Sequence, residues 1–311
     1  MALGLQRTMN KLLHKSLLVL SFLGLTMASG CRILAPESID NSKQNIAPEL
    51  VQANQTAIER GKPRVVLDSV GWVVGIPSKL LLWDSRVDNH RITEPTESAI
   101  AEYLAANELE HVKVRLNQYR PWEDAKRLTK NRTMAWPWRY SIGTLSVLGE
   151  ALIPGRIFGG DHFNPYTQTI HLYSDIPAIA LHEGAHAKDF SRRSYPGTYA
   201  AAYGLPIVPL YHESVATRDV IAYSQQTEDP DLERQAYNVL YPAYGTYVGG
   251  AIGTVLPPVS FPAYYGSVIL GHAAGRWQAS TVEIAARETA ARETTARETT
   301  ARETKEIEAT E

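Results

Sequence analysis

The strongest restriction on the structure of this chain comes from the pentapeptide HEGAH at positions 182–186. Apolar residues stand on both sides of it, and Pro177 occupies a place where a helix can begin. The sequence therefore predicts a buried helix over 175–193. His182 and His186 are four residues apart, so they project from one face of that helix. Two imidazoles in this arrangement can bind one Zn²⁺, while Glu183 reaches a water molecule beside the ion.

A third metal ligand has to come from a second element, because a catalytic zinc site normally takes three protein ligands. The only cysteine, Cys31, lies directly after an N-terminal apolar run, so the ligands must be His, Glu or Asp. Apolar residues over 210–223 predict a second buried helix that carries Glu213. We predict Glu213 as the third ligand; the alternative is that it is a surface carboxylate.

HExxH followed by a glutamate in an ExxA setting resembles the gluzincin zinc metallopeptidases, above all the minimal gluzincins and the prenyl-protease-like membrane metallopeptidases. The resemblance covers roughly residues 171–219. In the family the third ligand belongs to an ExxAD motif, but Thr217 stands here where the family has aspartate. Asp189 and Asp219 are the candidates for replacing that aspartate, which would orient a ligand histidine.

The resemblance implies one Zn²⁺ held by two histidines and a glutamate, with Glu183 as the general base. It also implies that the alternating strand over 167–173 is the edge strand that pairs with an extended peptide substrate. A plain core strand is the alternative. For stabilising the oxyanion, His212 and Tyr223 are the candidates, and Tyr211 is a further one.

The N-terminus has the features of a signal peptide over residues 1–30. Basic residues precede the apolar stretch Leu17–Met27, and small residues follow it up to Cys31. This arrangement resembles the lipobox of bacterial lipoproteins, in which the cysteine becomes the acylated first residue. Ala28 stands where that family usually has leucine, so ordinary cleavage is the alternative. The expected location is the bacterial cell envelope, lipid-anchored and facing the periplasm or the exterior.

The rest of the chain divides by composition. Residues 31–60 predict a flexible spacer, and 61–225 predict an α+β, zincin-like domain in which a small mixed sheet covers the active-site helix. Within that domain the apolar run over 65–83 predicts two short buried elements. His90 and His162 lie alone in turn-rich polar segments, so we predict that neither is a metal ligand.

Within residues 226–280, the stretch 238–276 is apolar and almost uncharged, and small residues recur there every four residues in two groups separated by Pro257-Pro258. The groups are Gly245, Gly249 and Gly253, and then Ser267, Gly271 and Gly275. This spacing predicts a helical hairpin whose arms pack closely and which can also contact a membrane. Residues 281–311 contain a repeated Ala-Arg-Glu-Thr motif without an apolar face. We predict that this tail is mostly disordered.

The formal net charge of −2 gives no basic surface for nucleic acid. The sequence favours a membrane-anchored zinc metallopeptidase that hydrolyses envelope or extracellular proteins or peptides. One alternative is a non-catalytic envelope lipoprotein whose zinc has a structural or binding role. Another is a zinc hydrolase with a different kind of substrate. A fourth protein ligand would favour the non-catalytic alternative, because catalysis needs an open coordination position.

Overall fold

The computed structural model describes residues 57–308. The chain divides into two units, residues 1–41 and 42–311, and all described residues belong to the second. The predicted signal peptide, Cys31 and residues 31–56 of the predicted spacer lie outside the described residues.

A small mixed sheet organises the N-terminal part of the described chain, which confirms the predicted α+β class. Its strands lie in the order β1-β2-β4-β3, and β1 and β4 run parallel to β2. The fourth strand, β3, pairs antiparallel with β4. The bounds are β1 Ile58–Arg60, β2 Lys113–Leu116, β3 His162–Asn164 and β4 Thr169–Leu172.

The predicted edge strand is wrong, because β4 lies inside the sheet with a partner on each side. β3 is the edge strand. The chain turns back at Gln168, which has a positive φ of 52°, so the short β3 covers the side of β4 that the prediction left open.

The two faces of the sheet carry different side chains and different helices. Val114, Ile170 and Leu172 are completely buried, and Phe163, the register partner of Ile170, packs against Phe190 of helix α10. Helices α5 (Glu94–Ala106) and α10 (Pro177–Ser191) pack together, and α10 also contacts β3 and β4.

The opposite face carries the alternate residues of the strands, and it is polar. Arg115 of β2 donates to Asp124 of α6 (Pro121–Lys130), with Nε 2.9 Å from Oδ1. Asn164 of β3 donates to Ser146 of α8 (Ile142–Leu152), with Nδ2 2.8 Å from Oγ. The sheet thus separates an apolar layer containing α10 from a polar layer containing α6 and α8.

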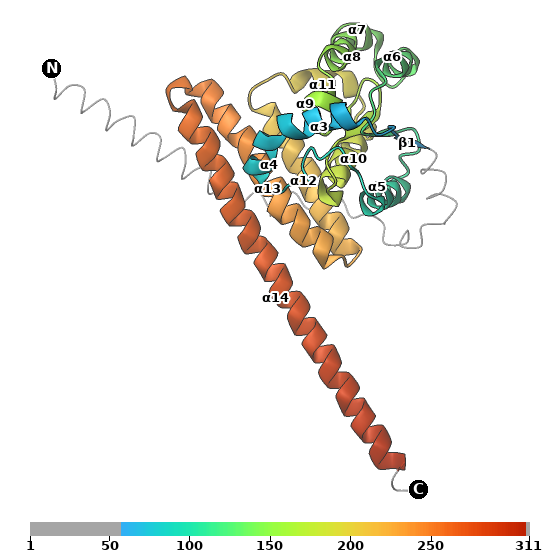
Figure 1. Ribbon diagram of the computed structural model, residues 1–311, viewed down its shortest axis with the longest axis vertical. Helices are drawn as coiled ribbons and strands as arrows, with labels where there is room; N and C mark the ends of the chain where they lie inside the picture. Colours follow the sequence, from blue (N-terminus) through green and yellow to red (C-terminus); the bar gives the residue numbers. More distant parts are fainter. Residues whose placement is uncertain (1–56, 309–311) are drawn as a thin grey trace, which may run out of the picture. The chain divides into compact units, whose positions relative to one another are not determined.

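The remaining helices are labelled in Figure 1 where space allows. Helix α12 packs between α10 and α13, and α13 packs along α14. The bounds are α3 Val65–Val74, α4 Ile76–Leu82, α7 Trp136–Tyr140, α9 Gly155–Phe158, α11 Pro196–Ala202, α12 Val208–Gln226, α13 Pro230–Val255, η2 Pro257–Val259 and α14 Ser260–Glu308.

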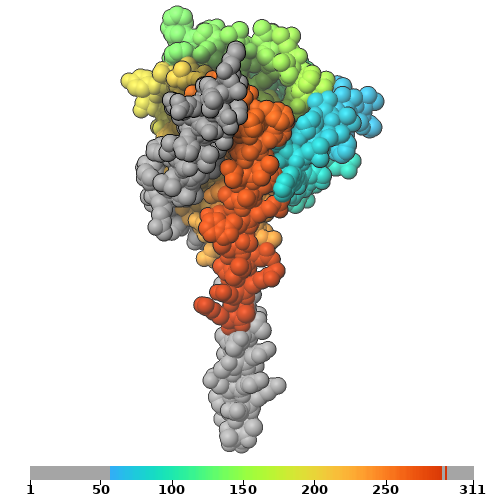
Figure 2. All heavy atoms as spheres, turned by 90° about the vertical axis from the view of Figure 1, so that its left-hand side faces the viewer, coloured from blue at the N-terminus to red at the C-terminus, as the bar shows by residue number. Residues whose placement is uncertain are grey.

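The segment over 65–83 forms two short helices, α3 and α4, but it is not buried as predicted. Val65 and Leu80 have 80% and 70% of their surfaces exposed. The reason is that this segment packs on only part of its surface. For example, the ring of Trp83 stacks on His272 of α14, and α4 lies beside α14 (Figure 2).

None of the described helices is by itself long and apolar enough to cross a membrane. Helices α3 and α4 pass that test only as a pair, bent by 48°.

Helices α13 and α14 form the predicted hairpin, with the break at Pro257–Val259. The spaced glycines lie where the two helices touch. A Cβ atom at Gly249 would lie 2.4 Å from the Cα atom of Tyr264, and one at Gly271 would lie 2.5 Å from the carbonyl oxygen of Tyr241. Only glycine allows the backbones to approach so closely at these positions.

The tail differs from the predicted disordered extension, because α14 continues as one helix to Glu308. Ala, Arg and Glu are strong helix formers, and a helix that has already started extends at little cost. Arg287 pairs with Glu283 at 2.5 Å, and Arg292 lies 4.0 Å from Glu288, both at the four-residue spacing. The corresponding side chains further along the repeat lie outside the described ones.

Candidate metal centre

Three predicted ligands converge on one point between α10 and α12. The Nε2 atom of His182 lies 3.0 Å from Oε2 of Glu213, and Nε2 of His186 lies 3.5 Å from Oε1 of the same carboxylate. The two Nε2 atoms are 3.2 Å apart. Ligand atoms about 2.0–2.1 Å from a tetrahedral Zn²⁺ lie roughly 3.3 Å from one another. The geometry of the trio therefore fits one zinc ion.

Helix α10 holds its two histidines in a tightly packed interior. Every residue from Ala178 to Lys188 is buried. Gly184 lies where α10 meets α5, and a Cβ atom there would come within 2.8 Å of the Tyr103 ring. At the start of the helix, the backbone N–H of Ala178 donates to the Gln235 side chain of α13 at 2.8 Å. The orientation of His182 and His186 is thus set by contacts along the whole helix.

The charges within the trio favour a bound cation. Burial alone would raise the pKa of Glu213, but the charge of His186 and the hydrogen bonds from both histidines lower it. Burial would lower the pKa of His186, yet Glu213 outweighs it and raises that pKa to about 9. His182 keeps a buried Nδ1 atom without a hydrogen-bond partner. The donor set of two imidazoles and one carboxylate is one that Zn²⁺ prefers.

Glu183 lies on the same helix, between the two histidines, and is 7% exposed. Its carboxylate makes no hydrogen bond to any residue that the structure describes. It does act electrostatically on groups around the trio. Burial and then Glu213 are the main causes that raise the pKa values of Tyr203 and Tyr247, and Glu183 adds to both. A buried carboxylate beside the metal trio, with no other partner, can accept a proton.

Two tyrosines at this site were missed in the sequence. The Tyr203 hydroxyl, just after α11, donates to Oε1 of Glu213 at 2.8 Å. Tyr247 of α13 forms a hydrogen bond with Tyr203 in turn. With 16 tyrosines in the chain, residue type gave no signal. Tyr247 lies 34 residues beyond Glu213, so only the packing of α12 against α13 brings it here.

The two predicted substitutes for the family's aspartate do not contact the histidines. Asp219 accepts hydrogen bonds from Tyr103 at 2.6 Å and from Lys188 at 2.8 Å, so it links α5, α10 and α12. Asp189 accepts from Tyr199 at 2.5 Å and is paired with Arg193. Both therefore hold elements together and do not orient a ligand ring.

The residues predicted to stabilise the oxyanion pack against other aromatic side chains. His212 is 1% exposed, its ring stacks on Tyr199 with centroids 4.0 Å apart, and neither ring nitrogen has a hydrogen-bond partner. Tyr223 lies ten residues after Glu213 on α12, roughly 15 Å along the axis, and packs against Tyr103. Tyr211 contacts His212 edge to face. Tyr203 is the phenol that contacts the trio directly.

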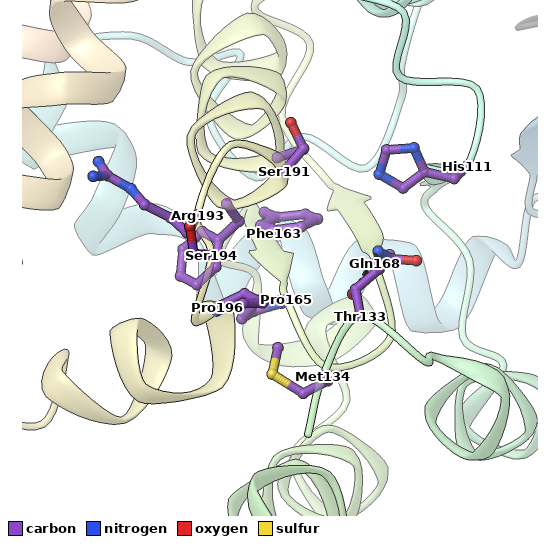
Figure 3. Close-up of a pocket in the computed structure, with 12 residues that line it drawn as sticks. His111, Thr133, Met134, Phe163, Pro165, Gln168, Ser191, Arg193, Ser194 and Pro196 are labelled. Atoms are coloured by element: carbon purple, nitrogen blue, oxygen red, sulfur yellow. Dashed lines mark hydrogen bonds between the residues drawn. The ribbon is translucent and has the colours of Figure 1, made fainter. Parts of the chain in front are cut away.

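A cavity of about 330 Å³ begins beside the C-terminal half of α10. Figure 3 shows Phe163, Pro165 and Gln168 of the β3–β4 hairpin beside the end of α10 that carries Ser191. Ala187, the neighbour of His186, also lines this cavity. The cavity therefore lies between the edge strand and the end of α10, and His182, His186 and Glu213 are not among the residues that line it.

No protein-family model matches this chain, and no curated protein or solved structure matches it either.

Proposed function

We propose that this chain is a zinc-dependent metallopeptidase of the gluzincin type. The observation that carries the proposal is the convergence of His182, His186 and Glu213, with donor distances of 3.0–3.5 Å, beside the unpartnered carboxylate of Glu183. When bound, a Zn²⁺ ion would supply a Lewis acid that polarises a peptide carbonyl and lowers the pKa of a water molecule.

Three residues of the chain would supply the proton transfer and the stabilisation of the oxyanion. Glu183 accepts the proton of the attacking water and passes it to the leaving nitrogen of the peptide bond. The Tyr203 hydroxyl, now bonded to Glu213, is placed to turn and donate to the substrate oxygen as that oxygen gains negative charge. Tyr247 holds the Tyr203 hydroxyl in place through their mutual hydrogen bond.

A peptide substrate is supported by the position of β3. This strand lies at the edge of the sheet and contacts α10, so its outer main-chain groups can pair with an extended peptide. The cavity beside Phe163 and Phe190 would then receive a substrate side chain. In this proposal the strand that pairs with the substrate is β3, which is three residues long, and not β4 as the sequence suggested.

An enzyme is favoured over the non-catalytic alternative by the number of ligands. Among the described residues, no fourth His, Cys, Asp or Glu joins His182, His186 and Glu213 within ligand distance. A site with three protein ligands keeps one position open for water or substrate, whereas structural zinc sites are closed by a fourth ligand.

The proposal includes attachment to a bacterial envelope membrane through acylated Cys31. It rests on the sequence alone, on the basic, apolar and small-residue pattern over residues 1–31. Diacyl chains on this cysteine would hold the domain at the periplasmic or outer surface. The substrates would then be envelope or extracellular proteins and peptides.

The decisive experiment compares the purified full-length chain with its Glu183→Gln variant for bound zinc and for hydrolysis of an unstructured protein. Glu110→Gln, which changes an exposed glutamate outside the site, is the matched control. We expect equal zinc in all three proteins, full activity in the control, and a loss of roughly 10²–10⁴-fold in Glu183→Gln.

Other outcomes would count against the proposal in different ways. Equal turnover by the parent and Glu183→Gln would exclude Glu183 as the base. Zinc binding without turnover in the parent would favour the non-catalytic alternative. Absence of zinc from the purified parent and after incubation with excess Zn²⁺ would exclude the metal site.

A further inference from the structure

A second cluster of metal-ligating side chains lies on the polar face of the sheet and shares no residue with the HExxH trio. Glu150 comes from α8, His162 from β3 and His171 from β4. His162 and His171 are register partners, so both side chains leave the sheet on the same face as Arg115. Their potential ligand atoms, with one carboxylate oxygen of Glu150, all lie within 4.8 Å of one another.

The two histidine rings are stacked, with centroids 4.8 Å apart and planes 13° apart, and both direct Nε2 toward Glu150. The distances are 3.1 Å from His162 Nε2 to Oε1 and 3.8 Å from His171 Nε2 to Oε2. Asn164 donates to Oε1 of the same carboxylate at 2.6 Å. The carboxylate is thus fixed between two imidazoles.

The tautomer of His162 is set by its other nitrogen. Nδ1 lies 2.9 Å from the carbonyl oxygen of Gly160, so it carries the proton and donates there. In the neutral ring, Nε2 then has a lone pair facing the Glu150 carboxylate. A histidine whose Nδ1 donates to a carbonyl, so that Nε2 can bind an ion, is the usual arrangement of a metal ligand.

An ion pair between His162 and Glu150 uses one carboxylate oxygen. Oε2 of Glu150 and Nε2 of His171 would stay buried without a hydrogen-bond partner. His171 is only 4% exposed, so water cannot readily supply one. Buried polar atoms left unpaired are costly. One cation placed among the three side chains would satisfy all three donors together.

We propose that Glu150, His162 and His171 form a second binding site for one divalent transition metal ion of the zinc type. Two imidazoles and a carboxylate are the donors that such ions select, whereas Mg²⁺ and Ca²⁺ prefer oxygen ligands only. The site goes beyond the proposed function, because it shares no ligand with the HExxH trio.

With three protein ligands, an ion here would keep one coordination position open, as in the HExxH trio. The space around the site leaves room at that position for water only, which favours a structural role for the ion. The adjoining cavity has a volume of about 70 Å³ and is also lined by Gln118, Arg120 and Tyr173. That volume corresponds to about two water molecules and is small for a large peptide side chain. The ion would tie α8 to the β3–β4 hairpin, and so hold in place the edge strand β3.

The test counts metal ions in the purified full-length chain. Zinc per chain is measured by elemental analysis after saturation and dialysis, and Co²⁺ titration followed by its visible absorption gives an independent count. The variants are Glu150→Gln, His162→Ala, Glu213→Ala and the double variant Glu150→Gln/Glu213→Ala. His111→Ala, which removes a histidine outside both clusters, is the control.

We expect two ions in the parent and in the control. One ion should remain in each single variant and none in the double variant. Two ions in Glu150→Gln and in His162→Ala would overturn the proposal, and so would a single ion in the parent that is lost in Glu213→Ala but kept in Glu150→Gln.

The ion counts also distinguish a failure of the second site from a failure of the HExxH trio. A single ion that is lost in Glu150→Gln but kept in Glu213→Ala would support the second site and count against the HExxH trio. Circular dichroism checks that each variant is folded. If Glu150→Gln does not fold, Glu213→Ala decides alone, because it should keep one ion and a count of zero would overturn the proposal.

Discussion

At the scale of single residues, Glu213 is the group on which the HExxH trio depends, because its carboxylate lies 3.0–3.5 Å from Nε2 of both histidines. Replacing it with alanine removes a ligand and leaves His182 and His186 as a pair. We expect Glu213→Ala to weaken binding at this site by more than the roughly 10–100-fold typical of losing an outer partner of a ligand. Competition with a chromophoric chelator measures the affinity.

Glu110→Ala is the control for Glu213→Ala, since it removes an exposed glutamate elsewhere. Because the proposed second site also binds zinc, the comparison is made in the Glu150→Gln background. An affinity in Glu213→Ala equal to that of its background protein would remove Glu213 from the ligand set.

Tyr203 gives a second prediction at this scale. The Tyr203→Phe variant removes the hydroxyl that contacts Glu213 but keeps the ring. We expect its zinc content and KM to stay close to those of the parent, while kcat falls by roughly 10²–10³-fold, the usual effect of losing one oxyanion donor. Steady-state kinetics on a peptide substrate measure both constants. Tyr195→Phe, at a tyrosine with 79% exposure, is the control.

The outcome for Tyr203→Phe separates two roles for the hydroxyl. An unchanged kcat would mean that the hydroxyl only helps to hold Glu213, and a loss of zinc would mean that it is needed for metal binding. In neither case would Tyr203 act on the substrate oxygen.

The three residues that converge as candidate ligands could be predicted from the sequence, whereas their neighbours could not. His182, His186 and Glu213 follow from helical spacing and from the chemistry of zinc, and both are local properties. The partners of Asp189 and Asp219 depend on how α10, α12 and the helices around them cross. Tyr203 lies outside any helix, and His162 becomes a candidate ligand only through its pairing with His171.

At the scale of elements, the contact between α13 and α14 can be tested at neighbouring glycines. A Cβ atom at Gly249 would lie 2.4 Å from the backbone of Tyr264, whereas one at Gly250 would have no neighbour within 4 Å. We expect Gly249→Ala to lower the free energy of unfolding by about 1–3 kcal/mol, because the helices must separate. Gly250→Ala should raise it by up to ~1 kcal/mol, because alanine favours the helix.

Urea denaturation of the parent and both glycine variants measures these free energies. Equal stability of Gly249→Ala and Gly250→Ala would show that the close approach of the two helices contributes nothing to the fold.

The helices and strands were predictable where apolar residues recur along one face of the segment. The periodicity of α10 and α12 and the alternation in β4 are properties of each segment alone. The edge position was not predictable, because it depends on the short β3 pairing outside β4. The exposure of α3 and α4 was missed for a related reason: an apolar composition does not say how much of a segment will find a partner.

At the scale of the whole molecule, a metal ion in the HExxH trio would join the sheet-covered part of the domain to the helical part. His182 and His186 belong to α10, which packs on the sheet, and Glu213 belongs to α12, which packs on α13. The α+β class and the helical hairpin were predictable separately. Their connection through α12 was not, since contacts between distant elements leave no periodic signal in the sequence.

This connection predicts that removing metal lowers the stability of the whole described domain. An ion that binds only the folded chain stabilises it by about 2.7 kcal/mol when its free concentration is 100 times Kd. For a domain of this size, each 1 kcal/mol shifts Tm by roughly 2–4 °C. We therefore expect a chelator to lower Tm by roughly 5–11 °C for each ion that it removes, and added Zn²⁺ to restore it, as followed by circular dichroism.

The variants separate the contributions of the two sites to this shift in Tm. Glu213→Ala should keep only the part that arises from Glu150, His162 and His171, and Glu150→Gln/Glu213→Ala should not respond to the chelator. A parent chain whose Tm is the same with chelator and with Zn²⁺ would show that neither ion stabilises the fold. If the double variant responds like the parent, the metal acts through other residues, because both proposed sites have been removed from it.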